Sequence, residues 1–181
     1  MNIAVYCAAS QSNCPAFDER TKELGKWMAQ KNHTLVYGGG NTGLMGVIAT
    51  SVMNAGGQVI GVMPQFFVDR EIAKKDITKL HIVETMSQRK NKMIELSEVY
   101  IALPGGPGTL EEIAEVVSWV RVGQTNGICI FYNMEGYYNH LESFFNHMVT
   151  TNLLSKEDRN QIYFANNLEE IEKLIENYEK R

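Results

Sequence analysis

The stretch IALPGGPGTLEE, residues 101–112, changes character twice and predicts how the chain folds. An apolar run is followed by a segment with three glycines and two prolines, and then by TLEEIAEVVSWV, in which apolar residues recur at helical spacing. This order predicts a buried strand, a tight turn and the start of a helix. Because the first N–H groups of a helix have no intrahelical partner, such a helix start can hold an anion.

The same alternation of short apolar runs and longer helical patterns extends over the rest of the chain. Strands are predicted at residues 2–7, 34–37, 58–62, 79–83, 99–103 and 128–132, with a short seventh at 161–164. Helices are predicted at residues 17–30, 43–55, 87–96, 109–122, 136–150 and 168–179. The pattern predicts an α/β protein, a Rossmann-like doubly wound parallel sheet of six to seven strands with helices on both faces. The irregular piece at residues 63–78 is predicted to be a functional loop or to contain a short helix.

The composition is that of one soluble domain. The chain has 181 residues, 44% hydrophobic and 21% charged, so a single domain spanning residues 1–181 is expected. A net charge of −4 argues against a nucleic-acid polymer as partner, although a small anion needs only a few local donors. The three cysteines show no metal-ligand spacing, and no apolar run approaches the about 18 residues of a membrane span. We therefore expect a cytoplasmic protein with no metal and no membrane partner.

Three loops that follow predicted strands should meet at one edge of the sheet. They are CAASQSNCP, YGGGNTGLMG and the glycine segment of residues 101–112. The second loop matches G-x-G-x-x-G at Gly38, Gly40 and Gly43, but the next strand ends in IGVMPQ, without the acidic residue of a dinucleotide site. It also lacks the Lys-Ser/Thr of a Walker A loop. Its glycines either serve packing alone or face a ligand, and the convergence of three similar loops favours a ligand.

The third loop is the most specific of the three. Its glycines are Gly105, Gly106 and Gly108. We expect them to permit positive φ and to leave N–H groups uncovered, while Thr109 caps the helix or donates its hydroxyl. With the partial positive charge of the helix start, this predicts a phosphate cradle without a lysine. A Gly-Pro turn with acids that compensate the helix dipole is the alternative; it explains Glu111 and Glu112 but not the glycines.

Charged residues gather around the same helix start. The predicted apolar stripe of the helix is Leu110, Ile113, Ala114, Val117 and Val120. A second face is shared by Glu111, Glu115 and Ser118. In ETMSQRKNKMIE, Arg89 and Lys90 begin the preceding helix, where cations are unfavourable. They are either solvated charges or an anion-binding or catalytic pair, because we expect their strand to neighbour the strand of the third loop.

Together these motifs resemble the LOG family of cytokinin riboside 5′-monophosphate phosphoribohydrolases, whose members are sometimes labelled lysine decarboxylases. Residues 104–112 meet every fixed position of the family's P-G-G-x-G-T-x-x-E, and residues 86–93 meet M-x-x-R-K-x-x-M. Residues 37–46 look like the family's glycine loop, and REI at residues 70–72 matches a segment whose glutamate, here Glu71, lies near the substrate. Ala8 replaces a glycine common in the family's first loop.

The resemblance implies hydrolysis of the N-glycosidic bond of a cytokinin riboside or adenosine 5′-monophosphate, giving free base and ribose 5-phosphate without a metal or organic cofactor. Glu112 is expected to stabilise the oxocarbenium-like transition state, and Arg89 to be the second catalytic residue. The expected substrate contacts are Ser10, Gly39, Gly40, Glu71, Lys90, Gly105, Gly106, Pro107, Gly108, Thr109, Leu110, Glu111 and Ser118. No Schiff-base lysine of a pyridoxal-phosphate decarboxylase can be assigned.

Two expectations concern partners and the competing function. The resemblance implies a homodimer, to which the apolar EVVSWVRVG with Trp119 contributes unless that stripe is core. The alternative to an enzyme is a non-catalytic protein that binds a nucleotide or carries a phosphorylated cofactor, such as the molybdenum cofactor. A carrier does not need both Arg89 and Glu112, so the presence of this pair favours the enzyme.

Overall fold

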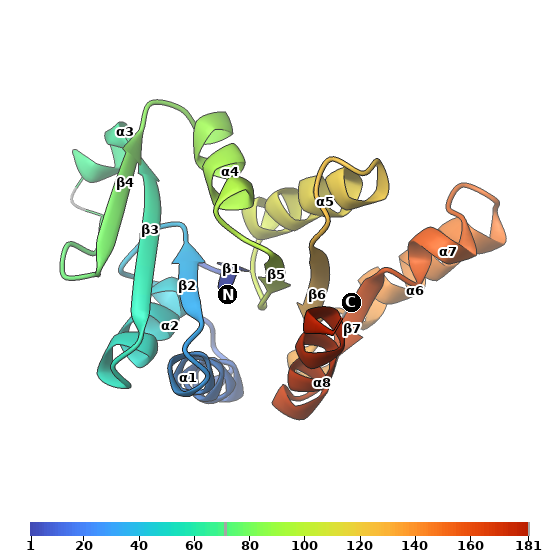
Figure 1. Ribbon diagram of the computed structural model, residues 1–181, viewed down its shortest axis with the longest axis horizontal. Helices are drawn as coiled ribbons and strands as arrows, with labels where there is room; N and C mark the ends of the chain where they lie inside the picture. The colour runs from blue at the N-terminus through green and yellow to red at the C-terminus, as the bar shows by residue number, and fades with distance from the viewer. Residues whose placement is uncertain (71, 181) are drawn as a thin grey trace.

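Seven parallel strands form one sheet in the computed structural model of the chain, which describes residues 1–70 and 72–180 (Figure 1). The strands are β1 (Asn2–Tyr6), β2 (Thr34–Tyr37), β3 (Gln58–Pro64), β4 (Lys79–Val83), β5 (Val99–Ala102), β6 (Ile128–Tyr132) and β7 (Ile162–Ala165). Their order across the sheet is β4-β3-β2-β1-β5-β6-β7, and every pairing is parallel. The predicted doubly wound sheet is confirmed.

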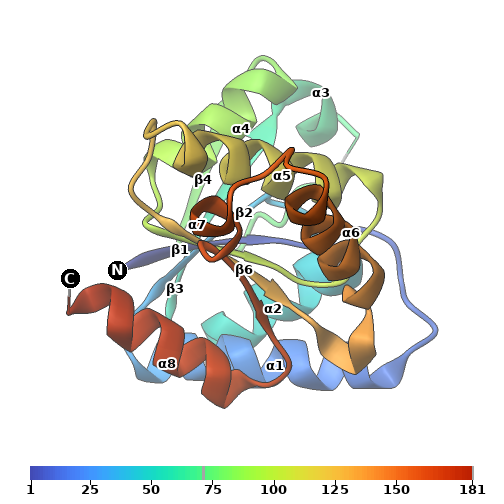
Figure 2. The ribbon, with the colours of Figure 1, turned by 90° about the vertical axis from the view of Figure 1, so that its right-hand side faces the viewer.

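Helices cover both faces of this sheet, as Figure 2 shows. One face carries α1 (Pro15–Gln30), α2 (Gly43–Asn54) and α8 (Leu168–Glu179), and the other carries α4 (Met86–Glu95), α5 (Pro107–Arg121) and α6 (Asn139–Thr150). Strands covered on both sides need apolar residues at every position. Accordingly, β5 and β6 are buried along their whole length.

The predicted elements are all present, and the differences lie at their ends. Helix α5 begins two residues before the predicted start, because Pro107 has no N–H to lose and its φ is already helical. The predicted helix 136–150 begins later, at Asn139, and a 3-10 turn, η1 (Met134–Gly136), precedes it and overlaps the predicted range at Gly136. The irregular piece 63–78 contains the short helix α3 (Gln65–Val68). Another short helix, α7 (Lys156–Arg159), was not predicted, although Ser155 caps it.

β4 was expected to lie beside β5, and this expectation is wrong. Arg89 nevertheless lies near the third loop, for another reason. β4 is an edge strand, separated from β5 by β3, β2 and β1. The crossover from β4 to β5 carries α4 back across the face of the sheet, so that α4 lies next to α5 (Figure 1). Arg89 therefore approaches the third loop through its helix and not through its strand.

The three predicted loops meet at one edge of the sheet, around the point where the strand order reverses. β1 and β5 are adjacent, yet α1 and α5 leave them for opposite faces, which opens the crevice where ligands bind in such sheets. Backbone hydrogen bonds join the loops: the N–H of Ala8 donates to the Pro104 carbonyl (3.2 Å) and that of Met45 to the Ala8 carbonyl (3.3 Å). None of the helices in the described part of the chain combines the length and apolar composition of a membrane span.

Candidate active site

The glycines of the third loop have different structural roles. The expected positive φ is found at none of them. Gly106 has a φ of −86°, and neither Gly105 nor Gly108 is among the described glycines with positive φ. A Cβ on Gly105 would lie 2.1 Å from the Thr109 hydroxyl oxygen, so Gly105 makes room for that side chain. A Cβ on Gly106 or Gly108 would meet nothing within 4 Å. Their missing side chains leave open space over the backbone, as a close approach of a ligand requires.

Within residues 1–70 and 72–180, the start of α5 has no side-chain cap. Gly106 is the N-cap residue. The first N–H groups of a helix are unpaired and attract anions. Thr109 is buried in the first turn, folded over Gly105. The phosphate cradle therefore stays a prediction, while the expected helix cap by Thr109 is not formed.

Packing explains two glycines of the second loop. A Cβ on Gly38 would lie 2.0 Å from Nη2 of Arg89, so this glycine provides the space that the guanidinium occupies. Gly43 has a φ of +57° and lies against the first loop, where a Cβ would be 2.5 Å from the Ser10 carbonyl oxygen. Gly39 accepts a backbone hydrogen bond from Lys74 and Gly40 forms a β-bridge with Ala73. A substrate contact of Gly39 or Gly40 stays a prediction.

Arg89, in the first turn of α4, and Glu112, in the second turn of α5, form a buried ion pair. The Nη2 of Arg89 lies 3.2 Å from Oε1 of Glu112, and each side chain is only 8% exposed. Thr85 and Gln88 form a capping box that fixes the start of α4. The buried Nε of Arg89 has no hydrogen-bond partner among the described residues. Because buried donors are almost always satisfied, this group points to a water molecule or ligand at the site.

The environment of Glu112 disfavours the ionised form of its carboxyl. Burial raises the pKa of its carboxyl, the Arg89 guanidinium opposes that rise, and Glu111 adds to it. Taking two charges out of water costs more than an isolated pair usually returns, so a buried pair is weak evidence of a stabilising role. Perturbed carboxyls in a crevice are instead typical of functional sites.

Helix α5 is rotated relative to the predicted stripe. Its buried face consists of Thr109, Glu112, Ile113 and Val116. Leu110, by contrast, is 43% exposed, and Ala114 is exposed as well. The hydrophobic pattern contains two apolar faces, and packing against the sheet buries the one that carries Ile113 and Val116, and Glu112 with them. The other face borders a groove of about 360 Å³ against α6.

Lys90 forms a second, outer ion-pair cluster beside the buried pair. Its ammonium contacts the carboxylates of Glu111 and Glu115, the latter at 2.8 Å. Hydrogen bonds to the carboxylates of Glu111 and Glu115 raise the pKa of Lys90. A Schiff-base lysine needs the opposite shift, because only the neutral amine is a nucleophile. The ammonium of Lys90 is thus bound to two carboxylates of α5. Its predicted contact with the substrate stays a prediction.

The remaining predicted contacts are dispersed. Ser10 and Pro107 are exposed at the loop edge of the sheet. Ser118 lies on the groove against α6 and donates its hydroxyl to the Ala114 carbonyl (3.0 Å), away from the Arg89–Glu112 pair. Glu71 lies outside the described residues.

Two consecutive tyrosines at the third loop were not predicted. The hydroxyl of Tyr137 donates to the Gly105 carbonyl (2.7 Å), and that of Tyr138 to the Leu103 carbonyl (2.6 Å). Both residues follow β6, the strand next to β5, so they emerge at the same edge of the sheet. Their position after the sixth strand was the available signal.

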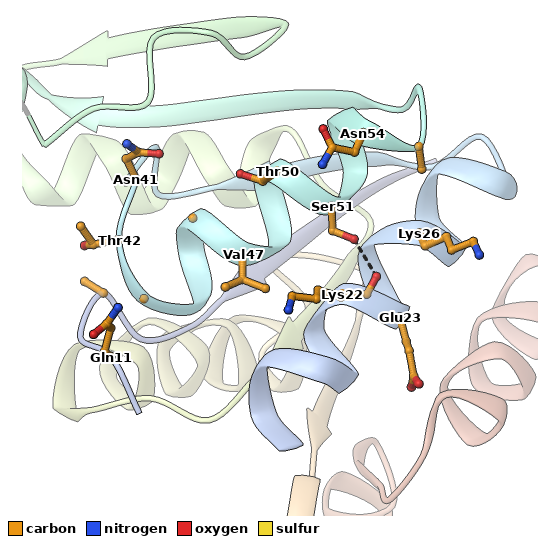
Figure 3. A pocket seen from close by; sticks show the side chains of 14 residues that line it. Gln11, Lys22, Glu23, Lys26, Asn41, Thr42, Val47, Thr50, Ser51 and Asn54 are labelled. Carbon is orange, nitrogen blue, oxygen red and sulfur yellow. Dashed lines mark hydrogen bonds between the residues drawn. The ribbon is translucent and has the colours of Figure 1, made fainter. Parts of the chain in front are cut away.

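A larger cavity than the groove against α6 lies on the opposite face of the sheet. A groove of about 890 Å³ runs between α1 and α2 from Gln11 and Thr42 to Asn54, with Lys22 and Lys26 projecting from α1 (Figure 3). The Ser51 hydroxyl donates to the Lys22 carbonyl (2.6 Å) and ties the two helices together at its floor. Neither Arg89 nor Glu112 lines this groove.

Fold and site together define a Rossmann-like α/β protein with a glycine-lined helix start and a buried arginine–glutamate pair near the reversal point of its sheet. Residues 45–175 match a family model described as "Possible lysine decarboxylase". The cytokinin riboside 5′-monophosphate phosphoribohydrolase LOG1 of Arabidopsis thaliana is 40% identical over 179 residues, which cover 99% of this chain and 84% of that protein. The enzyme of the same name from Rhodococcoides fascians is 35% identical over 93% of this chain and 85% of its own length. The chain belongs to the LOG family.

Solved structures agree on the fold. The molybdenum cofactor carrier protein of Chlamydomonas reinhardtii superposes with a TM-score of 0.77 at 20% identity, covering 99% of both chains. The molybdenum cofactor binding protein of Rippkaea orientalis gives a TM-score of 0.70 at 22% identity, over 97% of this chain and 95% of that one. At such identities the likeness describes the architecture alone.

Proposed function

We propose that the chain is a nucleoside 5′-monophosphate phosphoribohydrolase, a hydrolase that releases the free base and ribose 5-phosphate from cytokinin riboside or adenosine 5′-monophosphates. The observation that carries the proposal is the buried Arg89–Glu112 pair beside the open start of α5. The curated relatives named for this reaction align over nearly the whole chain and support the same activity.

In the proposed mechanism the third loop anchors the 5′-phosphate. The N–H groups of Gly106 and Gly108 and the hydroxyl of Thr109 donate to its oxygens, and the dipole of α5 favours its charge. Anchoring the phosphate holds the ribose over the next turn of α5, where Glu112 lies. Such positioning converts binding energy into orientation of the reacting bond.

Glu112 then acts on the anomeric carbon. As the bond to the base breaks, positive charge develops on the ribose, and the carboxylate stabilises it and orients the attacking water. The oxygen of water adds to the anomeric carbon, and the departing base takes up a proton. Arg89 keeps the neighbouring carboxylate ionised or polarises the leaving base.

The assay is direct. The purified chain is incubated with AMP and with isopentenyladenosine monophosphate, and free base is measured by chromatography. Release of base from either nucleotide supports the proposal, and no release from any nucleotide removes the enzyme class. Tight binding of AMP without turnover would favour the alternative, a carrier or nucleotide-binding protein, which needs the cradle but not the ion pair.

We also propose that the chain works as a cytoplasmic homodimer whose subunits meet through the groove between α5 and α6. Leu110, Phe144 and Leu153 are exposed there by 43%, 55% and 75%. Trp119 is half-buried, packs against the core and is not among the residues that line this groove. Sedimentation is expected to give a dimer for the wild type and a folded monomer for Phe144→Asp. A wild type that is monomeric at micromolar concentration would contradict the interface.

A further inference from the structure

The peptide that joins Gly105 to Gly106 is the most easily reoriented link in the third loop. A peptide flip changes ψ of the first residue and φ of the second by about half a turn and so drives φ of Gly106, now −86°, into the positive region. Glycine tolerates that region without the penalty of a Cβ. A Cβ at Gly106 would also meet no neighbour within 4 Å, so the space beside this end of the peptide is open.

The orientation of this peptide decides whether the loop attracts or repels an anion. In the observed orientation the carbonyl of Gly105 faces the Tyr137 hydroxyl. A flip would exchange the places of that oxygen and of the Gly106 N–H. A partially negative carbonyl oxygen would then stand where a donor to phosphate is needed.

The tyrosine that holds the carbonyl is itself fixed from two sides. The ring of Tyr137 meets Phe17 of α1 edge-on, with centroids 5.7 Å apart, and Tyr138 in the same way at 5.0 Å. The backbone is held as well: the side-chain oxygen of Asn133 accepts a hydrogen bond from the N–H of Tyr138 at 2.7 Å. The hydroxyl of Tyr137 therefore has a defined position, although its residue is 45% exposed.

We propose that Tyr137 is a positioning residue that locks the Gly105–Gly106 peptide in the orientation that presents the Gly106 N–H to the substrate's phosphate. The inference rests on the proposed function, because it assigns the loop a phosphomonoester. Tyr138 donates its hydroxyl to the carbonyl of Leu103, so the two tyrosines bind the loop on both sides of Pro104. Neither tyrosine belongs to the P-G-G-x-G-T-x-x-E motif that they orient.

The proposal predicts an effect on binding more than on the chemical step. Without the hydroxyl, the loop divides its time between two orientations, and only one binds phosphate. The apparent dissociation constant then rises by the inverse of the competent fraction, while saturating substrate restores the competent state. A neutral hydrogen bond of ordinary strength corresponds to a change of roughly three- to tenfold.

The test compares Tyr137→Phe, which keeps the ring on Phe17, with Tyr163→Phe as a matched control. Tyr163 lies on β7, which is separated from β5 by β6, and its side chain is half-buried. Calorimetry measures the binding of ribose 5-phosphate, inorganic phosphate and adenosine. Steady-state assays with AMP give KM and kcat, and nuclear magnetic resonance follows the Gly106 N–H.

Tyr137→Phe is expected to weaken ribose 5-phosphate and phosphate binding roughly three- to tenfold and to raise KM for AMP by the same factor, with kcat nearly constant. The Gly106 signal should broaden or double, and adenosine binding should stay as in the control. Unchanged phosphate binding, or an equal loss for adenosine, would overturn the proposal.

The two hypotheses fail in different ways. If the wild type hydrolyses no nucleotide but Tyr137→Phe still weakens phosphate binding, the enzymatic function is wrong and the role of Tyr137 stands. If the wild type hydrolyses AMP and Tyr137→Phe matches it in KM and phosphate affinity, the role of Tyr137 alone is wrong. A wild type that binds no phosphate overturns both.

Discussion

Two ion-pair clusters join the same two helices, one residue apart, and differ in almost everything else. Arg89 and Glu112 are each 8% exposed, whereas Lys90 is 15% exposed and its partner Glu111 57% exposed. One step along a helix turns a side chain by about 100°, so consecutive residues on α4 and α5 reach opposite environments.

The contrast separates a structural contact from a functional one. A partly exposed pair costs less to form than a buried one, and an exposed pair contributes up to about 1 kcal/mol, so the Lys90 cluster is suited to hold α4 against α5. The buried pair carries a desolvation cost that geometry alone rarely repays. In the proposed function the outer cluster fixes the helices, and the inner pair uses their fixed spacing. The following experiments test this division, from the largest expected effect to the smallest.

The first is Glu112→Gln, which keeps the shape of the side chain and removes its charge. We expect kcat for AMP to fall by about 10²–10³, because an electrostatic contact to the transition state is lost. Glu115→Gln removes a carboxylate one turn away, from the outer cluster, and should cost less than about tenfold. A correctly folded Glu112→Gln with unchanged turnover would remove the mechanism.

The second is Gly38→Ala, which perturbs the inner pair from outside it. The new methyl group would lie 2.0 Å from Nη2 of Arg89, so the guanidinium must move. A displacement of about 1 Å at a catalytic group can cost about 10² in rate. In an Arg89→Ala background the same substitution should cost little more, because its effect passes through Arg89. Additive losses in the double variant would contradict that route.

The third is the pH dependence of kcat/KM. Burial raises the pKa of Glu112, so activity should rise about tenfold per pH unit below that raised value and level off above it. The folded state also holds this proton more tightly than the unfolded chain does. Glu112 therefore lowers the stability as pH rises from the ordinary glutamate pKa through the raised one. An acidic limb at the ordinary glutamate value would argue against a buried catalytic carboxyl.

The smallest effect is expected for Lys90→Met, which keeps the aliphatic stem and removes the outer ion pairs. The free energy of unfolding in urea should fall by about 1 kcal/mol or less at low salt, and by less still at high salt. A loss that salt does not change would show that the outer cluster is not screened by solvent, and the contrast with the inner pair would disappear.

Local patterns were enough for much of this structure. β2, β4 and β6 have the predicted bounds, because their apolar runs are flanked by clear turns. The Arg89–Glu112 contact followed from the family resemblance of the two motifs. The reason for a glycine at position 38 could not be predicted, because the side chain that needs the space is Arg89, from a helix distant in the sequence. The buried face of α5 was also missed, because two apolar stripes fit one helix and only tertiary packing chooses between them.

The position of β1 in the middle of the sheet has a consequence for the order of folding. Asn2 pairs with Thr34 on one side of β1, but Ile3 pairs with Val99 on the other. Closing the longer loop costs more entropy, so β5 should join the sheet after β1–β3 have paired. The third loop and its helix would then be among the later parts to form, and the chain would acquire its chemistry late. Pulse-labelled amide exchange during refolding, with protection of β5 preceding that of β2, would refute this order.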